Sequence, residues 1–270
     1  MNRRLLSGAA PEVEELHGAL VSYGHFTTMQ VRGLAVQGFD LHLQRLNDAT
    51  RELFACDLDA RSVRDAIHRA LAAQANADCT LRVTVFMRAV DRCRRDASDG
   101  VTRAGAPAIL ITTRAADAHD LRPLRVRSYR HERVLPHIKH VGTFASHHYR
   151  RHAMQAGFDD ALFVDSCGLV LEGAFWNIGF WRDGRVIWPE APALRGTCER
   201  LLQAGLTRLG IEQSTQPVER SALAGFDAAF ICNARGVRPV GDIDGVAASP
   251  SPELHGLLVE ALATQPWQQL

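Results

Sequence analysis

Lysine is nearly absent from this sequence of 270 residues: Lys139 is the only one, although lysine and arginine together number 31. All the other residues in that total are arginines, whose guanidinium stays protonated and is a poor nucleophile. Any chemistry that requires the primary amine of a side chain therefore falls on Lys139.

An excess of charge is also missing, because the 31 basic residues face 30 acidic ones. A balanced charge gives no electrostatic footprint for nucleic acid, so no nucleic-acid partner is expected. No apolar run approaches the ~18 residues of a membrane span, and the N-terminus lacks the apolar stretch of a signal peptide. The six cysteines form no CxxC pair, which is typical of buried thiols in a reducing compartment. We expect a cytoplasmic protein with no membrane partner.

Motifs for metals and nucleotides are lacking as well. The sequence contains neither GxGxxG nor GxxxxGK[ST], so it offers no support for nucleotide binding. His148 and His152 are four residues apart, but the glutamate of an HExxH zinc motif does not follow His148. No metal site is predicted.

The first part of the chain predicts a small α/β domain over residues 1–115. Strands are expected at His17–Tyr23, 26–32, Thr80–Arg88 and Pro107–Thr113, where β-forming residues alternate or cluster. A helix is expected over Leu41–Cys56 with Asp40 as its N-cap, and a second helix begins with Ser62 as its cap. Residues 91–106 are polar and predict a loop.

Residues 116–123 are polar and lack an apolar period, which predicts an interdomain linker. The remainder, 124–270, predicts a larger domain of antiparallel strands and helices. Its elements are expected at 124–129, Thr143–Ala156, Asp160–Asp165, Leu169–Glu172, Phe175–Arg182, 185–188, 194–210, 228–232 and a last helix after Ser251. The fold class is therefore α+β (α/β) in two domains.

The surroundings of Lys139 suggest a specific chemistry. The lysine stands just before the helix expected at Thr143, and a hairpin further on carries Glu172. A lysine amine can form a Schiff base with the aldehyde of pyridoxal 5′-phosphate (PLP). A carboxylate such as that of Glu172 can keep the pyridine nitrogen protonated, so that the ring withdraws electrons. Each residue alone is more often a solvated surface charge, so the interpretation depends on other parts lying in order.

Several landmarks stand in such an order. They are Tyr23-Gly24-His25-Phe26-Thr27-Thr28, His42-Leu43-Gln44-Arg45-Leu46, Ile138-Lys139-His140, Glu172-Gly173-Ala174-Phe175-Trp176-Asn177-Ile178, Leu194-Arg195-Gly196-Thr197 and Ile231-Cys232-Asn233-Ala234. In this order the chain resembles the class IV aminotransferases, the fold-type IV PLP enzymes, over about residues 16–245. That family includes branched-chain and D-amino acid aminotransferases and aminodeoxychorismate lyases.

The resemblance implies a role for each matching residue. It implies that Lys139 is the catalytic lysine that carries PLP and that Glu172 meets the pyridine nitrogen. It implies that Arg45 binds the cofactor phosphate. The N–H groups of the helix opened by Gly196-Thr197-Cys198 and of the turn at Asn233-Ala234 would supply further phosphate donors. The resemblance also implies a homodimer with a small amino acid and a 2-oxo acid as substrates.

Two positions depart from the family pattern. The branched-chain enzymes have a tyrosine five residues after the lysine, where this chain has Phe144. The phosphate loop, commonly Gly-Ile-Thr-Arg, here reads Gly196-Thr197-Cys198-Glu199, so a thiol replaces a hydroxyl. Candidate contacts for a substrate carboxylate are Tyr23, Arg32, Arg130 and Arg238.

Three functions remain open from the sequence. The first is an aminotransferase that moves an amino group between an amino acid and a 2-oxo acid. The second is a lyase that eliminates pyruvate from aminodeoxychorismate, which Phe144 and the Thr27-Thr28 pair favour. The third is a non-catalytic relative that binds a ligand. The altered phosphate loop is the reason for considering it.

Overall fold

The computed structural model describes residues 4–6, 20–73, 78–87, 107–116 and 120–270. The loop expected over 91–106 lies outside these residues, and so does much of the strand expected at His17–Tyr23. The described part of that segment, 20–23, is not a strand, because β2 begins only at Gly24. Residue 24 can lie this close to β4 because it is a glycine: an added Cβ would lie 2.8 Å from the Val85 carbonyl oxygen.

The chain divides into two compact units. The first unit consists of Met1–Asp117, Ile138–Gly142 and Trp267–Leu270, and the second of Ala118–His137 and Thr143–Pro266. Two short pieces of the later chain therefore belong to the first unit. One of them contains Lys139.

A four-stranded antiparallel sheet in the order β1-β5-β4-β2 forms the first unit. Its strands are β1 (Arg4–Leu6), β2 (Gly24–Val31), β4 (Cys79–Met87) and β5 (Pro107–Ala115). The strands expected at Thr80–Arg88 and Pro107–Thr113 are therefore present. Along β4 the side chains of Leu81, Val83 and Val85 are fully buried, as the alternation predicts.

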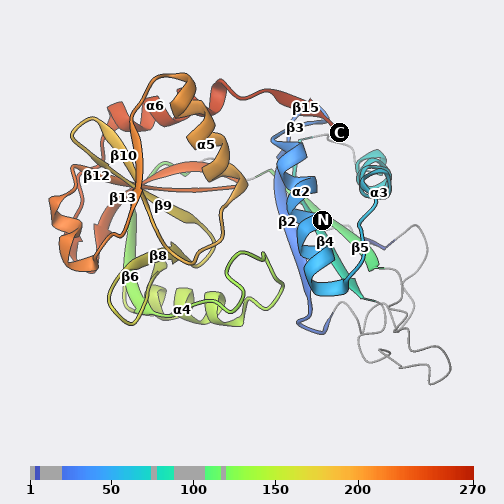
Figure 1. Ribbon diagram of the computed structural model, residues 1–270, viewed down its shortest axis with the longest axis horizontal. Coiled ribbons are helices and arrows are strands. Elements are labelled where there is room, and N and C mark those ends of the chain that lie inside the picture. The colour runs from blue at the N-terminus through green and yellow to red at the C-terminus, as the bar shows by residue number, and fades with distance from the viewer. Residues whose placement is uncertain (1–3, 7–19, 74–77, 88–106, 117–119) are drawn as a thin grey trace. The chain divides into compact units, whose positions relative to one another are not determined.

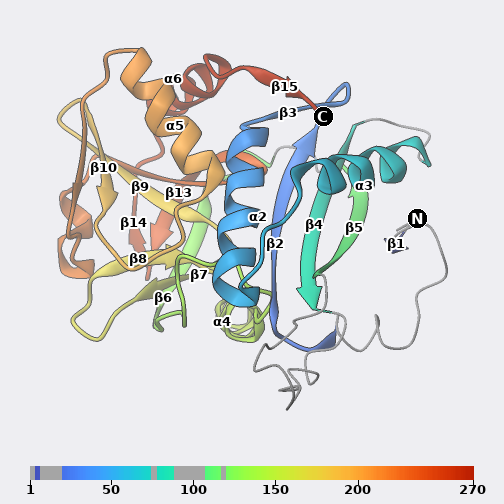
Figure 2. The ribbon, with the colours of Figure 1, turned by 45° about the vertical axis from the view of Figure 1, so that its right-hand side comes forward.

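Two helices cover one face of this sheet, α2 (Phe39–Phe54) and α3 (Ala60–Ala72) (Figures 1 and 2). Their start signals were predicted wrongly. The N-cap of α2 is Gly38, in the left-handed region at φ 65°, and not Asp40. The N-cap of α3 is Asp59, whose carboxylate accepts from the N–H groups of Arg61 and Ser62. Ser62 lies inside the first turn and adds its hydroxyl to the same carboxylate.

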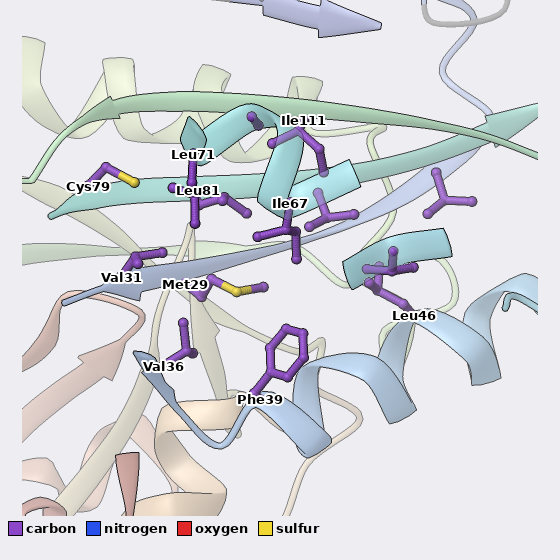
Figure 3. Packing of buried hydrophobic residues seen from close by; sticks show 14 of the residues in the cluster. Met29, Val31, Val36, Phe39, Leu46, Ile67, Leu71, Cys79, Leu81 and Ile111 are labelled. Carbon is purple, nitrogen blue, oxygen red and sulfur yellow. The ribbon is translucent and has the colours of Figure 1, made fainter. Parts of the chain in front are cut away.

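The core of the first unit lies between these helices and the sheet. Figure 3 shows Phe39 of α2 beside Met29 of β2, and Leu71 of α3 beside Leu81 of β4; Leu46 and Ile67 belong to the same cluster. Each of these side chains is at most 5% exposed. Removing this apolar surface from water is the main stabilising contribution to the unit.

The end of the chain joins the same unit. Strand β15 (Trp267–Gln269) pairs antiparallel with β3 (Ala35–Gln37). The Asp40 N–H, in the first turn of α2, donates to the Gln268 side-chain oxygen at 3.1 Å. A residue 228 positions away thus supplies an acceptor at this helix start.

The second unit is built on one nine-stranded sheet in the order β11-β10-β9-β12-β13-β6-β7-β8, with β14 paired to β13. Its strands are β6 (Leu124–Arg130), β7 (Asp160–Val164), β8 (Val170–Gly173), β9 (Asn177–Arg182), β10 (Arg185–Pro189), β11 (Gln213–Gln216), β12 (Ala228–Asn233), β13 (Gly236–Ile243) and β14 (Val246–Ala247). The pairs β6–β7, β6–β13 and β10–β11 are parallel, and the others are antiparallel.

Three α-helices and one 3₁₀ helix accompany this sheet, namely α4 (Phe144–Gln155), α5 (Thr197–Arg208), α6 (Pro252–Ala263) and η1 (Arg220–Gly225). Helices α5 and α6 pack closely, because a Cβ added at Gly205 would lie 2.1 Å from the Ala261 carbonyl oxygen. The mixture of strands and helices in both units confirms the predicted α+β class.

Candidate functional site

Lys139 lies in a short extended segment at the edge of the first unit's sheet. The Phe26 N–H donates to the Lys139 carbonyl at 2.9 Å, and the Val141 N–H donates to the Gly24 carbonyl at 2.9 Å. Because β2 is the outer strand at this edge, the two bonds extend the sheet by one short ladder. The backbone of the single lysine is thereby fixed to β2.

The side chain of Lys139 is half-buried and its Nζ lies 5.0 Å from the centroid of the Phe26 ring. The guanidinium carbon of Arg82, on the neighbouring β4, lies 3.6 Å from the same centroid. Burial lowers the pKa of Arg82 from its usual value. Two cationic side chains therefore share the surroundings of one aromatic ring, whose face attracts cations.

Arg45 projects from α2 into a row of polar groups between the helix and β2. Its Nη2 donates to the Thr27 hydroxyl and lies 3.3 Å from His42 Nδ1. Burial, followed by the charges of Arg45 and Lys139, holds the pKa of His42 well below its ordinary value. The first unit thus brings Arg45 and Lys139 into electrostatic contact with one buried histidine.

In the second unit Glu172 accepts from Arg133 and from the Leu194 backbone. Arg133 Nη1 lies 3.2 Å from Oε1, and the Leu194 N–H donates to Oε2 at 3.3 Å. The side chains of Arg133 and Glu172 are 13% and 7% exposed, so this ion pair is largely removed from water. The carboxylate therefore has a fixed orientation on β8.

Asn177 fixes the segment that leads to helix α5. Its Nδ2 donates to the Leu194 carbonyl at 2.5 Å. A Cβ added at Gly196 would lie 2.3 Å from Asn177 Oδ1, so the chain passes close to this amide only because residue 196 is glycine. Glu172 and Asn177 hold Leu194 from its two sides, by its N–H and by its C=O.

Helix α5 begins at this point with Gly196 as an extended N-cap that has no side-chain hydrogen bond. Thr197, Cys198 and Glu199 form its first turn and are all buried. Glu199 pairs with Arg195 at 3.0 Å, and burial raises the pKa of Glu199 above its usual range. The first-turn N–H groups and the positive end of the helix dipole form a surface that favours an anion.

The turn between β12 and β13 contains the other two predicted phosphate residues, Asn233 and Ala234. Asn233 Oδ1 accepts from the Arg235 N–H at 2.8 Å, and its Nδ2 lies 3.4 Å from the Phe175 carbonyl oxygen. Just before it, Cys232 hydrogen-bonds to Cys198, and this bond together with burial raises the Cys232 pKa well above the ordinary value. The two thiols join the start of α5 to the end of β12.

The four candidate substrate contacts are spread over the two units. Tyr23 donates its hydroxyl to the Leu53 carbonyl at 3.0 Å, and Arg32 donates to the Val31 carbonyl at 2.9 Å. Arg130, at the end of β6, is exposed. Arg238 pairs with Asp120 at 3.2 Å and donates to the Arg122 carbonyl at 2.6 Å.

Among the described residues, no group of three or more His, Cys, Asp or Glu side chains is arranged to hold a metal ion. None of the helices in that part of the chain is long and apolar enough to cross a bilayer.

Residues 24–243 match the family model described as amino-transferase class IV. This chain belongs to the class IV aminotransferase family. The match spans Lys139, Arg45, Glu172 and the start of α5, and it confirms both the resemblance seen in the sequence and the expectation of an enzyme.

Solved structures of class IV aminotransferases and related proteins share the fold. One is a hypothetical aminotransferase from Mycobacterium tuberculosis in a PLP-bound form, with a TM-score of 0.77 and 20% identity over 96% of both chains. Another is a candidate 4-amino-4-deoxychorismate lyase from Legionella pneumophila, with a TM-score of 0.82 and 17% identity over 96% of this chain and 97% of that one.

A third similar structure is the branched-chain aminotransferase of Thermoproteus uzoniensis with norvaline. Its TM-score is 0.79 at 20% identity, and the match covers 94% of this chain and 89% of that chain. Likeness at these identities shows the two-unit fold of the class IV aminotransferases.

Sequence reasoning assigned no role to Arg133, because the residue stands 39 positions before its partner Glu172 and belongs to no motif. Thr27 and His42 were noticed as parts of landmarks but not as partners of Arg45. The sequence does contain a signal for the contact between His42 and Arg45, because residues three positions apart lie on one face of a helix.

Proposed function

We propose that this class IV family member is a PLP-dependent aminotransferase that transfers an amino group between an amino acid and a 2-oxo acid. The observation that carries the proposal is the single lysine, in a segment that two backbone hydrogen bonds of Lys139 and Val141 fix to β2, in a chain of this family. No other side chain of the sequence offers a primary amine.

The donor set of the chain fits PLP. A phosphate dianion requires a cation and several N–H donors, which Arg45 and the uncapped first turn of α5 offer. A protonated pyridine nitrogen requires a carboxylate acceptor, which Glu172 offers in a buried and oriented form. Asn233 and Ala234 add polar backbone at the β12–β13 turn.

Each residue then has a defined task. When bound, PLP supplies an aldehyde for an amine and a pyridine ring that accepts electron density. Lys139 Nζ would hold the cofactor, and its free amine would accept the α-proton of the substrate as general base and later donate that proton again. Glu172 would accept a hydrogen bond from the ring nitrogen. Arg45, Gly196, Thr197 and Cys198 would bind the phosphate.

The substrate side of the proposal is less specific. Tyr23, Arg32, Arg130 and Arg238 stay candidates for the substrate carboxylate. Arg32 and Arg238 would have to loosen their present ion pairs with Asp78 and Asp120 to accept it. By family we also propose a homodimer, and from the scattered cysteines we propose a cytoplasmic location.

Borohydride reduction of PLP-treated protein, followed by peptide mass spectrometry, tests the cofactor assignment. We expect one label on the peptide that contains Lys139 and none in Lys139→Ala. Single L- and D-amino acids, added without an acceptor, should then convert the bound cofactor to its amine form, and the responding amino acid names the donor. Absence of any PLP uptake would support the ligand-binding relative instead.

A second candidate is a lyase that eliminates pyruvate from aminodeoxychorismate. The observation in its favour is Phe144, which stands where the branched-chain enzymes have a tyrosine. The residue is 81% exposed and its ring is stacked on His148, with centroids 5.7 Å apart. A phenyl ring has no hydroxyl to donate to the cofactor. Pyruvate release from aminodeoxychorismate without any added 2-oxo acid distinguishes this reaction, because a lyase needs no amino acceptor.

A further inference from the structure

A buried row of hydrogen bonds connects helix α2 to strand β2 in the first unit. Arg45 Nη2 donates to Thr27 Oγ1, and Thr27 Oγ1 lies 2.6 Å from His42 Nδ1. Thr27 and His42 are 0% and 4% exposed. The three side chains therefore form a line from the half-buried Arg45 into the interior.

The donors of this row can be assigned from its chemistry. A guanidinium has only N–H donors, so the Thr27 oxygen must accept from Arg45. His42 Nδ1 faces both the Thr27 hydroxyl and, at 3.3 Å, Arg45 Nη2, which can only donate. We therefore assign the lone pair of a neutral His42 to Nδ1, where it accepts from Thr27, and the ring proton to Nε2.

The surroundings of His42 favour this neutral form. Burial is the largest effect, and the charges of Arg45 and Lys139 act in the same direction to lower its pKa. A protonated His42 would place a donor on Nδ1 against the Thr27 hydroxyl and a cation 3.3 Å from Arg45 Nη2. The row is complete only while the imidazole is uncharged.

We propose that Thr27 and His42 are positioning residues that fix the direction of the Arg45 guanidinium for a phosphate group. The inference rests on the proposed function in taking that phosphate to be the one of PLP. The five N–H groups of arginine lie in a rigid planar fork, so anchoring one of them at Thr27 sets the direction of the others. Affinity for the phosphate should then depend on a hydroxyl that does not touch it.

The chain provides a matched control further along the same helix. Thr50 is also 0% exposed, and its hydroxyl donates to the Leu46 carbonyl at 2.8 Å. His25 Nε2 lies 2.9 Å from the Thr50 oxygen, which makes a second buried threonine–histidine pair. A change at Thr50 disturbs the same helix–strand contact without removing the acceptor of Arg45.

The test compares the affinities of the apo protein for PLP and for pyridoxal, which lacks the phosphate. Thr27→Val should weaken PLP binding by about tenfold, the loss expected for one charge-assisted hydrogen bond, and leave pyridoxal binding unchanged. Thr27→Ser should keep the wild-type preference for PLP. Thr50→Val should keep that preference too, although it lowers the melting temperature.

A second variant tests the requirement for an acceptor. His42→Asn can place its amide oxygen near the position of Nδ1, so it should retain the preference for PLP, while His42→Leu should lose it. Equal loss of PLP and pyridoxal binding in Thr27→Val, or the same phosphate-specific loss in Thr50→Val, would overturn the proposal.

Failure of the cofactor assignment would give a different result. If the wild type binds neither PLP nor pyridoxal, the proposed function fails and inorganic phosphate becomes the probe. A rise of the melting temperature with phosphate that is lost in Thr27→Val would still support the positioning role. No rise in the wild type would overturn it as well.

Discussion

Asn177 occupies the space that a side chain at residue 196 would need: its Oδ1 would lie 2.3 Å from a Cβ at Gly196. The same amide donates to the Leu194 carbonyl at 2.5 Å. The approach to helix α5 is therefore shaped by a missing side chain and a buried amide together, and this approach sets where the first-turn N–H groups point.

Gly196→Ala should displace Asn177 and break its bond to Leu194. Forcing a methyl group into a packed site costs about 1–3 kcal/mol of unfolding free energy. We expect weaker PLP binding in addition, measured by titration of the apo protein. In the double variant with Asn177→Ala the methyl group has room, so the two stability losses should be less than additive. Strict additivity would contradict the contact.

Gly205→Ala should destabilise the packing of α5 on α6. Its new Cβ would lie 2.1 Å from the Ala261 carbonyl oxygen, which is backbone and cannot rotate away. The expected loss is again about 1–3 kcal/mol in urea unfolding.

Gly256→Ala is the control for this prediction, because residue 256 lies within α6 and a Cβ added there would meet no neighbouring element within 4 Å. Alanine is a better helix former than glycine by about 1 kcal/mol, so this variant should be as stable as the wild type or more stable. Similar losses in both variants would mean that general helix effects, and not the close contact, explain Gly205.

Arg133→Met should be strongly destabilising, because it removes the cation that lies 3.2 Å from the 7% exposed Glu172 carboxylate. Removing one partner of a buried ion pair costs about 3–5 kcal/mol. The double variant Arg133→Met, Glu172→Leu removes both charges and should recover part of that loss in the apo protein. Unfolding curves in urea give both values, and a double variant no more stable than the single one would contradict the pairing.

The first unit should lose stability on mild acidification because of His25. Burial, and then the charge of Arg45, lower its pKa from 6.5 to about 4. Above pH 6.5 the imidazole is neutral in both states, so the full stability is present. Between pH 6.5 and about 4 the unfolded chain binds a proton that the folded chain does not, and stability falls by up to about 3 kcal/mol.

Melting temperatures measured across this pH range check the prediction. His25→Gln keeps a polar side chain without a group that titrates there, and it should flatten the profile. His42, whose pKa is lowered as well, should leave a residual slope in that variant. An unchanged profile in His25→Gln would show that His25 is not the group responsible.

The regular elements could be predicted from the sequence because their signals are local. Alternation along residues 80–88 and helical spacing after Asp40 both correspond to observed elements, β4 and α2. The helix starts were less predictable. Asp40 has the right chemistry for an N-cap, but Gly38 adopts the required position and Gln268 supplies the acceptor for the Asp40 N–H. No pattern within one segment reports such a partner.

The candidate site shows the same division. Lys139, Glu172 and Arg45 could be chosen as candidates because family landmarks surround them. Arg133, and the roles of Thr27 and His42, follow only from hydrogen bonds between segments distant in the sequence. The shape of a substrate pocket was not predictable, because loops without periodicity carry no comparable signal.

The pairing of β15 with β3 has a consequence for how the protein is made. A ribosome releases the residues of β3 and α2 early, but Trp267–Gln269 emerge much later. The first unit therefore acquires β15, the partner strand of β3, only after the whole second unit has been synthesised. The Gln268 side chain, which accepts from the Asp40 N–H of α2, arrives at the same time. The N–H of Leu270 donates to the Leu34 carbonyl at 3.1 Å, so this late-made residue also takes part in the docking.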